Sequence, residues 1–327
     1  MTKFIGRRTT VSIGREAVDY GTKSLQMTDF PIQELTVDTG KDVLLNDQAF
    51  GLIEDNCLGS AIGKKTAEFT IKGVVSDSFF GQILYAALGT LTTSIDTPVS
   101  GAIQHTFTAL QTNEHPSYSF IYKDDNDVKA ILGALLSTLE INIVAGEWAT
   151  YTATFMGMFP SDTTETIAPA KEEYFTASQS VCKIASAVAG LAGATATPLE
   201  SGTLTFEKNL ESHFAWGSNN VEKVHNKQLA ITGSFELLYD NDTLFDNFDD
   251  NDIQAMSITM TTDSFITGTT PYSIAFTVPA FHIPTWSSPK ALDDLVTQAF
   301  EIKAEYDTVT SKMIDAVVIN DTANAAY

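Results

Sequence analysis

Histidine and acidic side chains in the second half of the chain are of the types that bind metal ions. His213 and His225 lie on either side of Glu222, but they are too far apart in the sequence for any standard zinc pattern. Residues 240–252 include six aspartates, whose oxygens suit Ca²⁺, yet the segment lacks the glycine and the bidentate glutamate that an EF-hand requires. The pattern favours surface histidines and a solvated acidic helix or turn, and it predicts no metal and no cofactor. A nonstandard cation site in the aspartate run is the alternative.

Glutamate and tryptophan side chains are the residue types of glycan chemistry. Glu301 and Glu305 share one face of an expected strand, where residues four apart are separated by roughly 13 Å, too far for the carboxylate pair of a glycosidase. Trp148, Trp216 and Trp286 are scattered along the chain, which favours packing over a sugar platform. The sequence has no G-x-S-x-G motif, no P-loop, and no G-x-G-x-x-G after a strand. We therefore expect no enzyme, and a glycan-acting β-scaffold is the least favoured alternative.

The net charge of the chain limits its partners. The 327 residues carry 19 Lys and Arg against 41 Asp and Glu, for a net charge of −22. This balance argues against direct binding of DNA or RNA, which depends on cations that displace counterions from phosphates. It is typical either of a surface that only keeps the protein in solution or of one that must lie beside nucleic acid without binding it. No apolar run reaches the ~18 residues of a membrane helix, so no membrane partner is expected.

Alternating polar and apolar residues predict a mainly β protein. In residues 66–71, Ala67, Phe69 and Ile71 share one face of an expected strand, and the same period recurs in residues 300–306. One segment in each half has helical character. Residues 79–88 form an apolar face that starts after Ser76 or Asp77 as N-cap and stops at Gly89, and residues 242–248 form a shorter, acidic counterpart.

Similar landmarks occur twice along the chain. The first half has the strand end IKG at 71–73 followed by LEI at 139–141, and the second half has ITG at 231–233 followed by FEI at 300–302. The two intervals are almost equal in length, and a repeat of this size is a duplicated domain. We expect two tandem domains, residues 1–160 and 161–327, each a β-sandwich or half-barrel with one flanking helix.

The first half contains a long segment at residues 43–61. The interval from Leu35 to Gly73 is longer than the matching interval from Leu204 to Gly233, and the excess falls in this segment. Loops longer than roughly 12–15 residues are usually functional or disordered. The apolar side chains of Phe50, Leu52 and Ile53 favour an arm that docks on another surface, with a loop folded on its own domain as the alternative.

Four patches of the sequence resemble the tail tube (major tail) proteins of long-tailed bacteriophages. They are VSIGREAVDYGT at residues 11–22, KKTAEFTIKG at 64–73, GEWATYTATF at 146–155 and LAITGSF at 229–235. Each patch is short, but their order and spacing follow the family over most of the chain. The other structural class that the composition allows is a virion or surface β-protein such as an adhesin or spike module.

The resemblance implies a structural virion protein and not an enzyme. Such chains form rings, either trimers of duplicated domains or hexamers, which stack into a hollow tail tube through which DNA passes without specific binding. Assembly would take place in the host cytoplasm, and the partners would be further copies of the chain and other tail proteins such as the tape measure and terminator.

Two sets of residues are the candidates for these functions. Because acidic walls would repel DNA, we expect lumen-facing carboxylates among the acids that alternate with core residues; the outer surface is their other possible location. These candidates are Glu68, Glu140, Glu301 and Glu305. The candidates for contact with the adjacent ring are Phe50, Leu52 and Ile53.

Overall fold

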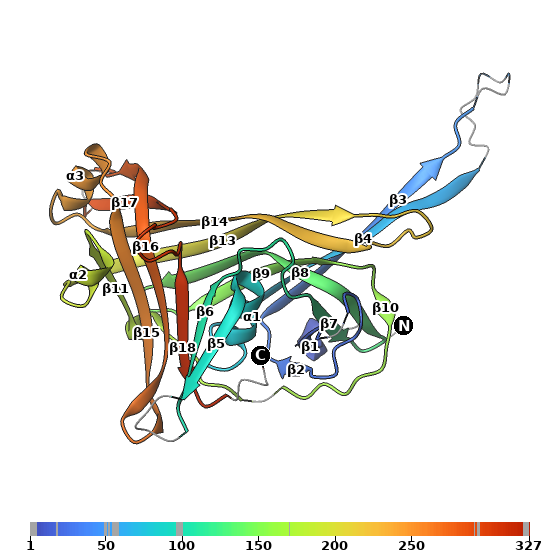
Figure 1. Cartoon of the computed structure of the whole chain (residues 1–327), viewed down its shortest axis with the longest axis horizontal. Coiled ribbons are helices and arrows are strands. Elements are labelled where there is room, and N and C mark those ends of the chain that lie inside the picture. The colour runs from blue at the N-terminus through green and yellow to red at the C-terminus, as the bar shows by residue number, and fades with distance from the viewer. Residues whose placement is uncertain are drawn as a thin grey trace.

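The computed structural model describes residues 5–17, 19–48, 51, 53, 59–95, 101–169, 171–290, 292, 295–322 and 327. In this part of the chain the structure is mainly β, as expected, with antiparallel pairing between the strands and three short α-helices (Figure 1). The candidate residues Phe50 and Leu52 lie outside the described residues. None of the helices that the structure describes has the length and apolar character needed to cross a membrane.

The first half supplies ten strands and one α-helix. They are β1 (Thr10–Arg15), β2 (Thr28–Phe30), β3 (Glu34–Leu45), β4 (Ser60–Val74), α1 (Phe80–Leu88), β5 (Gly89–Ile95), β6 (Ile103–Ala109), β7 (Tyr118–Lys123), β8 (Val128–Val144), β9 (Thr150–Gly157) and β10 (Ser161–Asp162). The second half supplies the remaining elements. They are β11 (Ser180–Ala185), α2 (Val188–Leu191), β12 (Ala196–Thr197), β13 (Leu199–His213), β14 (Lys223–Leu238), α3 (Thr243–Asp249), β15 (Gln254–Thr267), β16 (Thr270–Ser287), β17 (Thr297–Ala304) and β18 (Asp315–Asn320).

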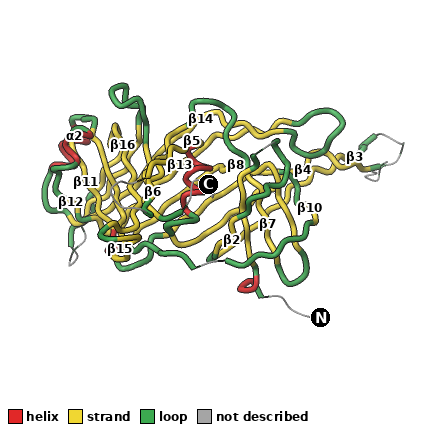
Figure 2. The backbone as a smooth tube through the Cα atoms, turned by 60° about the horizontal axis from the view of Figure 1, so that its bottom comes forward, coloured by secondary structure: helices red, strands yellow, loops and turns green. Residues whose placement is uncertain are grey.

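One antiparallel sheet runs through both halves of the chain. Its order is β3-β4-β9-β8-β13-β14-β17-β16, and we call it the long sheet. Strands β8 and β16 join it only with their C-terminal parts, residues 135–144 and 281–287. The junction between the halves is the pairing of β8 with β13, which leaves no break in the sheet (Figure 2).

Two smaller sheets branch from the long sheet. The N-terminal part of β8 pairs with β7 and β10, and β1 and β2 extend this sheet beyond β7. In the same way, the N-terminal part of β16 pairs with β15 and β18, and β11 and β12 extend it beyond β15. The second of these sheets also continues through β6 and β5 of the first half, because β6 pairs with β18.

The pairing pattern of the first half recurs in the second, and its irregularities recur with it. Strands β1-β2-β3-β4-β7-β8-β9-β10 pair in the same scheme as β11-β12-β13-β14-β15-β16-β17-β18. Register shifts fall at three equivalent points, namely Lys41/Val43 with Lys208/Leu210, Tyr118/Phe120 with Gln254/Met256, and Leu136/Thr138 with His282/Thr285. Since bulges are specific features of a ladder, they align the two halves residue by residue. This recurrence supports two tandem units, although their division near residue 160 stays a proposal.

The structure corrects two details of the sequence interpretation. The stretch at residues 300–302 lies in β17, whose counterpart is β9, so it does not match residues 139–141 of β8. The landmarks are nearly equidistant only because the first half carries an inserted hairpin, β5–β6, between its helix and β7. The helix α1 also begins later than expected. Its N-cap position is Phe79 and not Ser76 or Asp77, and the Phe79 amide donates to the Glu172 carboxylate at 3.2 Å.

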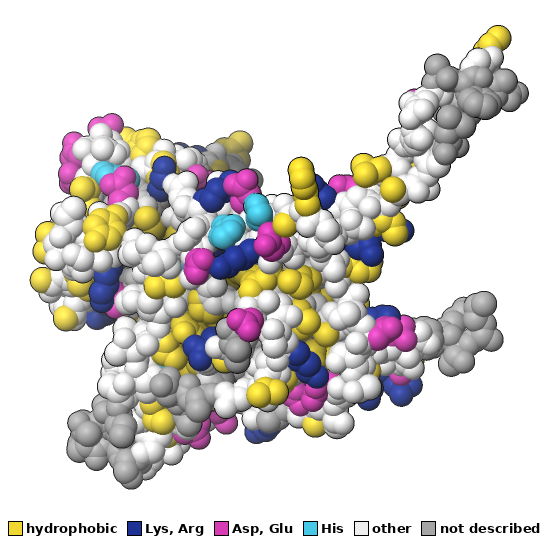
Figure 3. All heavy atoms as spheres, turned by 45° about the vertical axis from the view of Figure 1, so that its right-hand side comes forward, with side chains coloured by type: hydrophobic (Ala, Val, Ile, Leu, Met, Phe, Trp, Pro, Cys, Tyr) yellow, Lys and Arg dark blue, Asp and Glu magenta, His cyan; other side chains and the backbone are white. Residues whose placement is uncertain are grey.

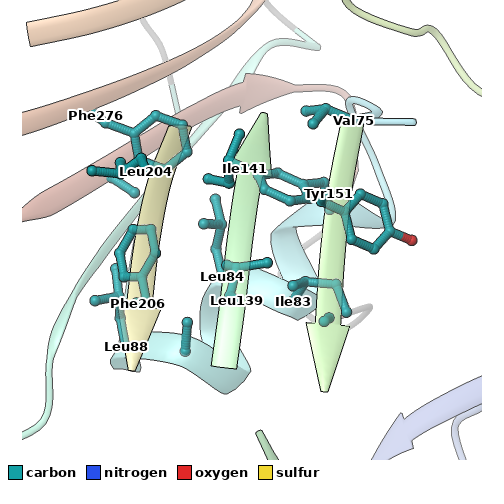
Figure 4. Close-up of a cluster of buried hydrophobic side chains, with 14 of the residues drawn as sticks. Val75, Ile83, Leu84, Leu88, Leu139, Ile141, Tyr151, Leu204, Phe206 and Phe276 are labelled. Carbon is teal, nitrogen blue, oxygen red and sulfur yellow. The ribbon is translucent and has the colours of Figure 1, made fainter. Parts of the chain in front are cut away.

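The main core lies between the long sheet and α1. Ile83, Leu84 and Leu88 of the helix point toward β8, β9 and β13 (Figure 4). Facing them are fully buried side chains such as Leu139 and Phe206. Each large apolar side chain buried in this way contributes about 1.5–3 kcal/mol. Gly89 ends the helix with φ at 89°, a conformation that favours glycine. The helix therefore fixes one face of the long sheet against the body of the protein.

Candidate assembly surface

The other face of the long sheet is open and polar. Side chains alternate between the two faces of a strand, and the register places threonine and serine in rows across this open face. These residues are Thr36, Thr70, Thr138, Thr152, Thr154, Thr203, Thr205, Thr232 and Ser234. Thr70 and Thr154 are joined by a hydrogen bond of 3.0 Å between their hydroxyls. A broad polar face that no other layer of the protein covers is suited to contact with water or with a polar molecule.

The acids selected from the sequence lie together on this face. Glu68, Glu140 and Glu301 are exposed members of its rows, and exposed Glu305 follows directly after β17, 3.3 Å from His282. In these rows carboxylates outnumber lysines. The carboxylates are Glu34, Asp38, Glu68, Glu140, Glu207, Glu236 and Glu301, and the lysines are Lys72 and Lys303. The open face therefore carries a net negative charge.

Both edges of the long sheet are unpaired among the described residues. Strand β3 pairs only with β4, and residues 282–287 of β16 pair only with β17. The inner junction shows how such edges combine, because β8 and β13 are the counterparts of β16 and β3. There the register runs from Val144 opposite Ser201 to Thr138 opposite Glu207. Unpaired strand edges are templates for another chain.

The hairpin of β3 and β4 extends beyond the body as an arm (Figures 1 and 3). Val43, Leu44 and Leu45 are each more than half exposed, and Ile62 of the opposite strand is 41% exposed. Ile53, the one arm candidate that the structure describes, is fully exposed. The segment expected as a loop is thus strand at both of its ends, and those of its apolar side chains that the structure describes are exposed.

The equivalent hairpin, β13–β14, lies on the first half of the chain. Val221 and Val224 near its tip are buried against Leu135 of β8, and Tyr20, Leu210 and Phe214 pack on the same cluster. The amide of Lys65 donates to the Asn219 carbonyl at 2.8 Å, and Lys223 pairs with Glu114 at 2.7 Å. The two hairpins are therefore alike in pairing but differ in whether they have a surface to lie on.

A carboxylate network positions the surface on which this hairpin lies. The side chain of Glu16 accepts hydrogen bonds from four donors, the Gly21 and Gly133 amides and the Ser117 and Ser119 hydroxyls. Gly133 has φ at 61°, and a Cβ there would lie 2.6 Å from the Tyr20 ring. The motif at residues 14–21 thus folds back on β7 and β8 and holds Tyr20 under the hairpin.

A buried lysine links the two halves beneath this hairpin. Lys208 of β13 is 2% exposed, and its Nζ donates to the Ala86 carbonyl in the last turn of α1 at 2.5 Å. His115 Nδ1 lies 3.0 Å from the same Nζ. The C-terminal end of a helix carries partial negative charge, which favours a cation there. Burial lowers the pKa of Lys208 to about 7, and burial together with the nearby lysine lowers the pKa of His115 to about 4.

The depressed pKa of Lys208 predicts a pH-dependent stability. Between pH 7 and the ordinary value of 10.5 the unfolded chain binds more protons than the folded chain, so stability rises with pH across this window. The gain attributable to Lys208 is about 1 kcal/mol per pH unit. The Lys208→Met variant should lack it. Urea unfolding of both proteins at pH 7, 8 and 9 measures the difference, and parallel pH profiles would contradict the assignment.

The other residues considered for chemistry do not lie together in one site. His213 and Glu222 form an exposed pair at 3.0 Å, and the described residues contain no group of three potential metal ligands. Trp286 packs against Phe245 of α3, whereas Trp216 is fully exposed. Sequence reasoning did not single out Glu16, His115 or Lys208. The alternation that places Leu204, Phe206 and Lys208 on one face of β13 was the available signal for the lysine.

Comparison with known families gives one match. The model of a family described as phage tail tube protein matches residues 6–304. No curated protein matches the chain. The matched range begins before β1 and ends with β17, so it includes the whole long sheet, the arm and both free edges.

Proposed function

The chain belongs to the phage tail tube protein family, and from this premise we propose that it polymerises into stacked rings that form the hollow tail tube for genome passage. As a member of this family it is a structural protein of the virion tail. The proposed partners are further copies of the chain and other tail proteins such as the tape measure and terminator, with assembly in the host cytoplasm.

The observation that carries the proposal is the pair of free edges on the long sheet. Inside the chain, Glu140 of β8 lies opposite Thr205 of β13. The alignment of the bulges makes Ser287 the counterpart of Glu140 and Asp38 the counterpart of Thr205. Repeating the inner junction between chains therefore places Ser287 of one copy opposite Asp38 of the next. This contact is heterologous, and it closes into a ring when the rotation allows.

The number of strands sets the width of a closed ring. Each chain contributes the eight strands of the long sheet, so three chains give 24 strands in a closed barrel. With strands about 4.8 Å apart and a tilt of about 40°, such a barrel is roughly 50 Å across its backbone. Six chains would double this diameter. We propose a trimer of six pseudo-equivalent units, residues 1–160 and 161–327 of each chain, with a hexamer as the alternative outcome.

Closure of the barrel supports a polar, acidic lumen. The helix α1 and the two smaller sheets lie on one side of the long sheet (Figure 1), so a closed ring has room for them only on its outer side. The open face with Glu68, Glu140, Glu301 and Glu305 then lines the lumen. Its carboxylates repel the phosphates of passing DNA over about 10 Å at 0.1 M salt, and its hydroxyls offer no cationic site that would hold the DNA.

The tip of the arm is proposed to contact the adjacent ring. The arm extends from the end of the long sheet where β3 ends and β4 begins (Figure 1). Apolar side chains on a protruding hairpin are unfavourable in water unless a partner covers them. Stacking contacts are heterologous and do not close, so they generate a filament.

Negative-stain microscopy with native mass measurement of an isolated ring tests the proposal. We expect rings or tubes of uniform width and a ring mass of three chains. A ring of six chains would support the hexamer. Single, unassembled molecules under all conditions that favour polymerisation would contradict the proposed function.

A further inference from the structure

The two flanking helices differ in which side chains lie at their C-terminal ends. The end of α1 receives Lys208 from the other half of the chain. The counterpart helix, α3, has no basic residue in its last turn and carries Asp246, Asp249 and Asp250 instead. In the described part of the chain these three aspartates form no ion pair. Negative charge at the negative end of a helix dipole is destabilising. The counterpart of Lys208 is thus missing from its expected place beside α3.

The counterpart of Lys208 in the repeat is Lys41. Each lysine is the last paired residue before the bulge in the first strand of its hairpin, opposite Leu229 for Lys208 and opposite Lys65 for Lys41. Both point to the side of the sheet that faces the core. Lys208 is buried under the other half of its chain, whereas Lys41 is exposed and forms no ion pair among the described residues. The lysine that α3 lacks is therefore present, but it lies at the opposite edge of the long sheet.

We propose that Lys41 of one copy binds the C-terminal end of α3 in the neighbouring copy of the same ring, beside Asp249 and Asp250. This inference rests on the proposed ring and repeats the Lys208–α1 contact across the subunit boundary. Two observations support a second copy as the occupant. The charges are complementary, and the contact repeats between chains the arrangement that the pairing of β8 with β13 forms within one chain.

The same repetition divides the arm into two parts. Val43 is the counterpart of Leu210, which packs on the cluster around Leu135. The base of the arm, residues 39–43 and 62–65, is then a contact within the ring, and only the part beyond it reaches the next ring. A lateral contact of this kind orients the tip before stacking begins.

Charge reversal with a matched rescue tests the inference. Lys41→Glu should raise the concentration needed for half-maximal ring formation roughly tenfold, since a partly buried attraction becomes a repulsion at each boundary. The triple variant Lys41→Glu, Asp249→Lys and Asp250→Lys should return it close to the wild-type value. Lys171→Glu, the same charge change at another exposed lysine, should leave it unchanged. Sedimentation velocity over a concentration series measures the ring fraction, and circular dichroism confirms that each variant is folded.

The outcomes separate this inference from the function on which it rests. If the wild-type protein forms rings and Lys41→Glu assembles like Lys171→Glu, the contact with α3 is wrong and the ring stands. If Lys41→Glu weakens assembly but the triple variant assembles no better, Lys41 binds elsewhere and the inference is overturned. If the wild-type protein forms no ring, the proposed function fails and this contact fails with it.

Discussion

A variant with Asp38→Cys and Ser287→Cys should form a covalently closed trimer on mild oxidation. Directly opposite residues on neighbouring antiparallel strands have Cβ atoms about 4.5–5.5 Å apart, within reach of a disulfide after small adjustment. Both positions are exposed in the single chain and lie on the open face. Because each chain carries one cysteine at each edge, a closed ring has a disulfide at every boundary. Non-reducing gel electrophoresis should show three chains as the dominant product.

Matched controls make this experiment depend on register. The pair Asp38→Cys with Ser288→Cys moves one thiol by one residue and hence to the opposite face of the strand, so it should not cross-link. Oxidised wild-type protein reports on the native Cys57 and Cys182, of which Cys182 is buried. A six-chain product would replace the trimer by the hexamer. An open-ended ladder, or equal cross-linking of both pairs, would contradict the edge-to-edge closure.

Deleting residues 44–56 should abolish tube formation and leave ring formation intact. The deletion removes Leu44, Leu45 and Ile53 of the arm but keeps Lys41 and Val43 at its base. The core beneath α1 does not include this segment, so each chain should still fold. Electron microscopy should show single rings in place of tubes, and the mass of particles in light scattering should fall to that of one ring.

A second arm variant distinguishes length from apolar character. Replacing residues 44–56 by a glycine-serine segment of equal length keeps the span but removes the apolar side chains. This variant should also fail to stack if buried apolar area drives the contact between rings. Normal polymerisation of the deletion variant would show that the arm is not the stacking element.

The fold class and the open face could be predicted because both depend on local alternation. A period of two fixes which residues share a face, so Glu68, Glu140 and Glu301 could be assigned to one side of their strands before the strands were ordered. The order of the strands depends on distant pairing. The local pattern indicates a strand at residues 104–110, but it does not show that this strand pairs with β5 and β18. The insertion of the β5–β6 hairpin displaced the match between residues 139–141 and 300–302.

The position of the arm could be predicted from the sequence, but the reason for its protrusion could not. Aligned at the bulges, the two hairpins differ little in length, because the span from Lys41 to Lys65 nearly equals the span from Lys208 to Leu229. Most of the excess length that the sequence indicates comes from matching Leu35 to Leu204 and Gly73 to Gly233, because the bulges align Leu204 with Val37 and Gly233 with Phe69. The arm protrudes mainly because the described part of its own chain offers it no surface like the one on which β13–β14 lies. The protrusion of the arm depends on the surface that another copy provides. The sequence of one chain indicates it only through apolar residues that have no partner within that chain.

The pairing of β6 with β18 makes the junctions around a ring unequal, because it strengthens the junction within a chain but not the junction between chains. Where the halves of one chain meet, two separate ladders and a peptide connection cross the boundary. Where two chains meet, the equivalent strand pairing is missing, because the second half has no inserted hairpin in the described residues. A ring of three chains would therefore alternate stiff and compliant seams, with three of each. Under bending or osmotic load, such a cylinder would open along its three compliant seams and shed whole chains.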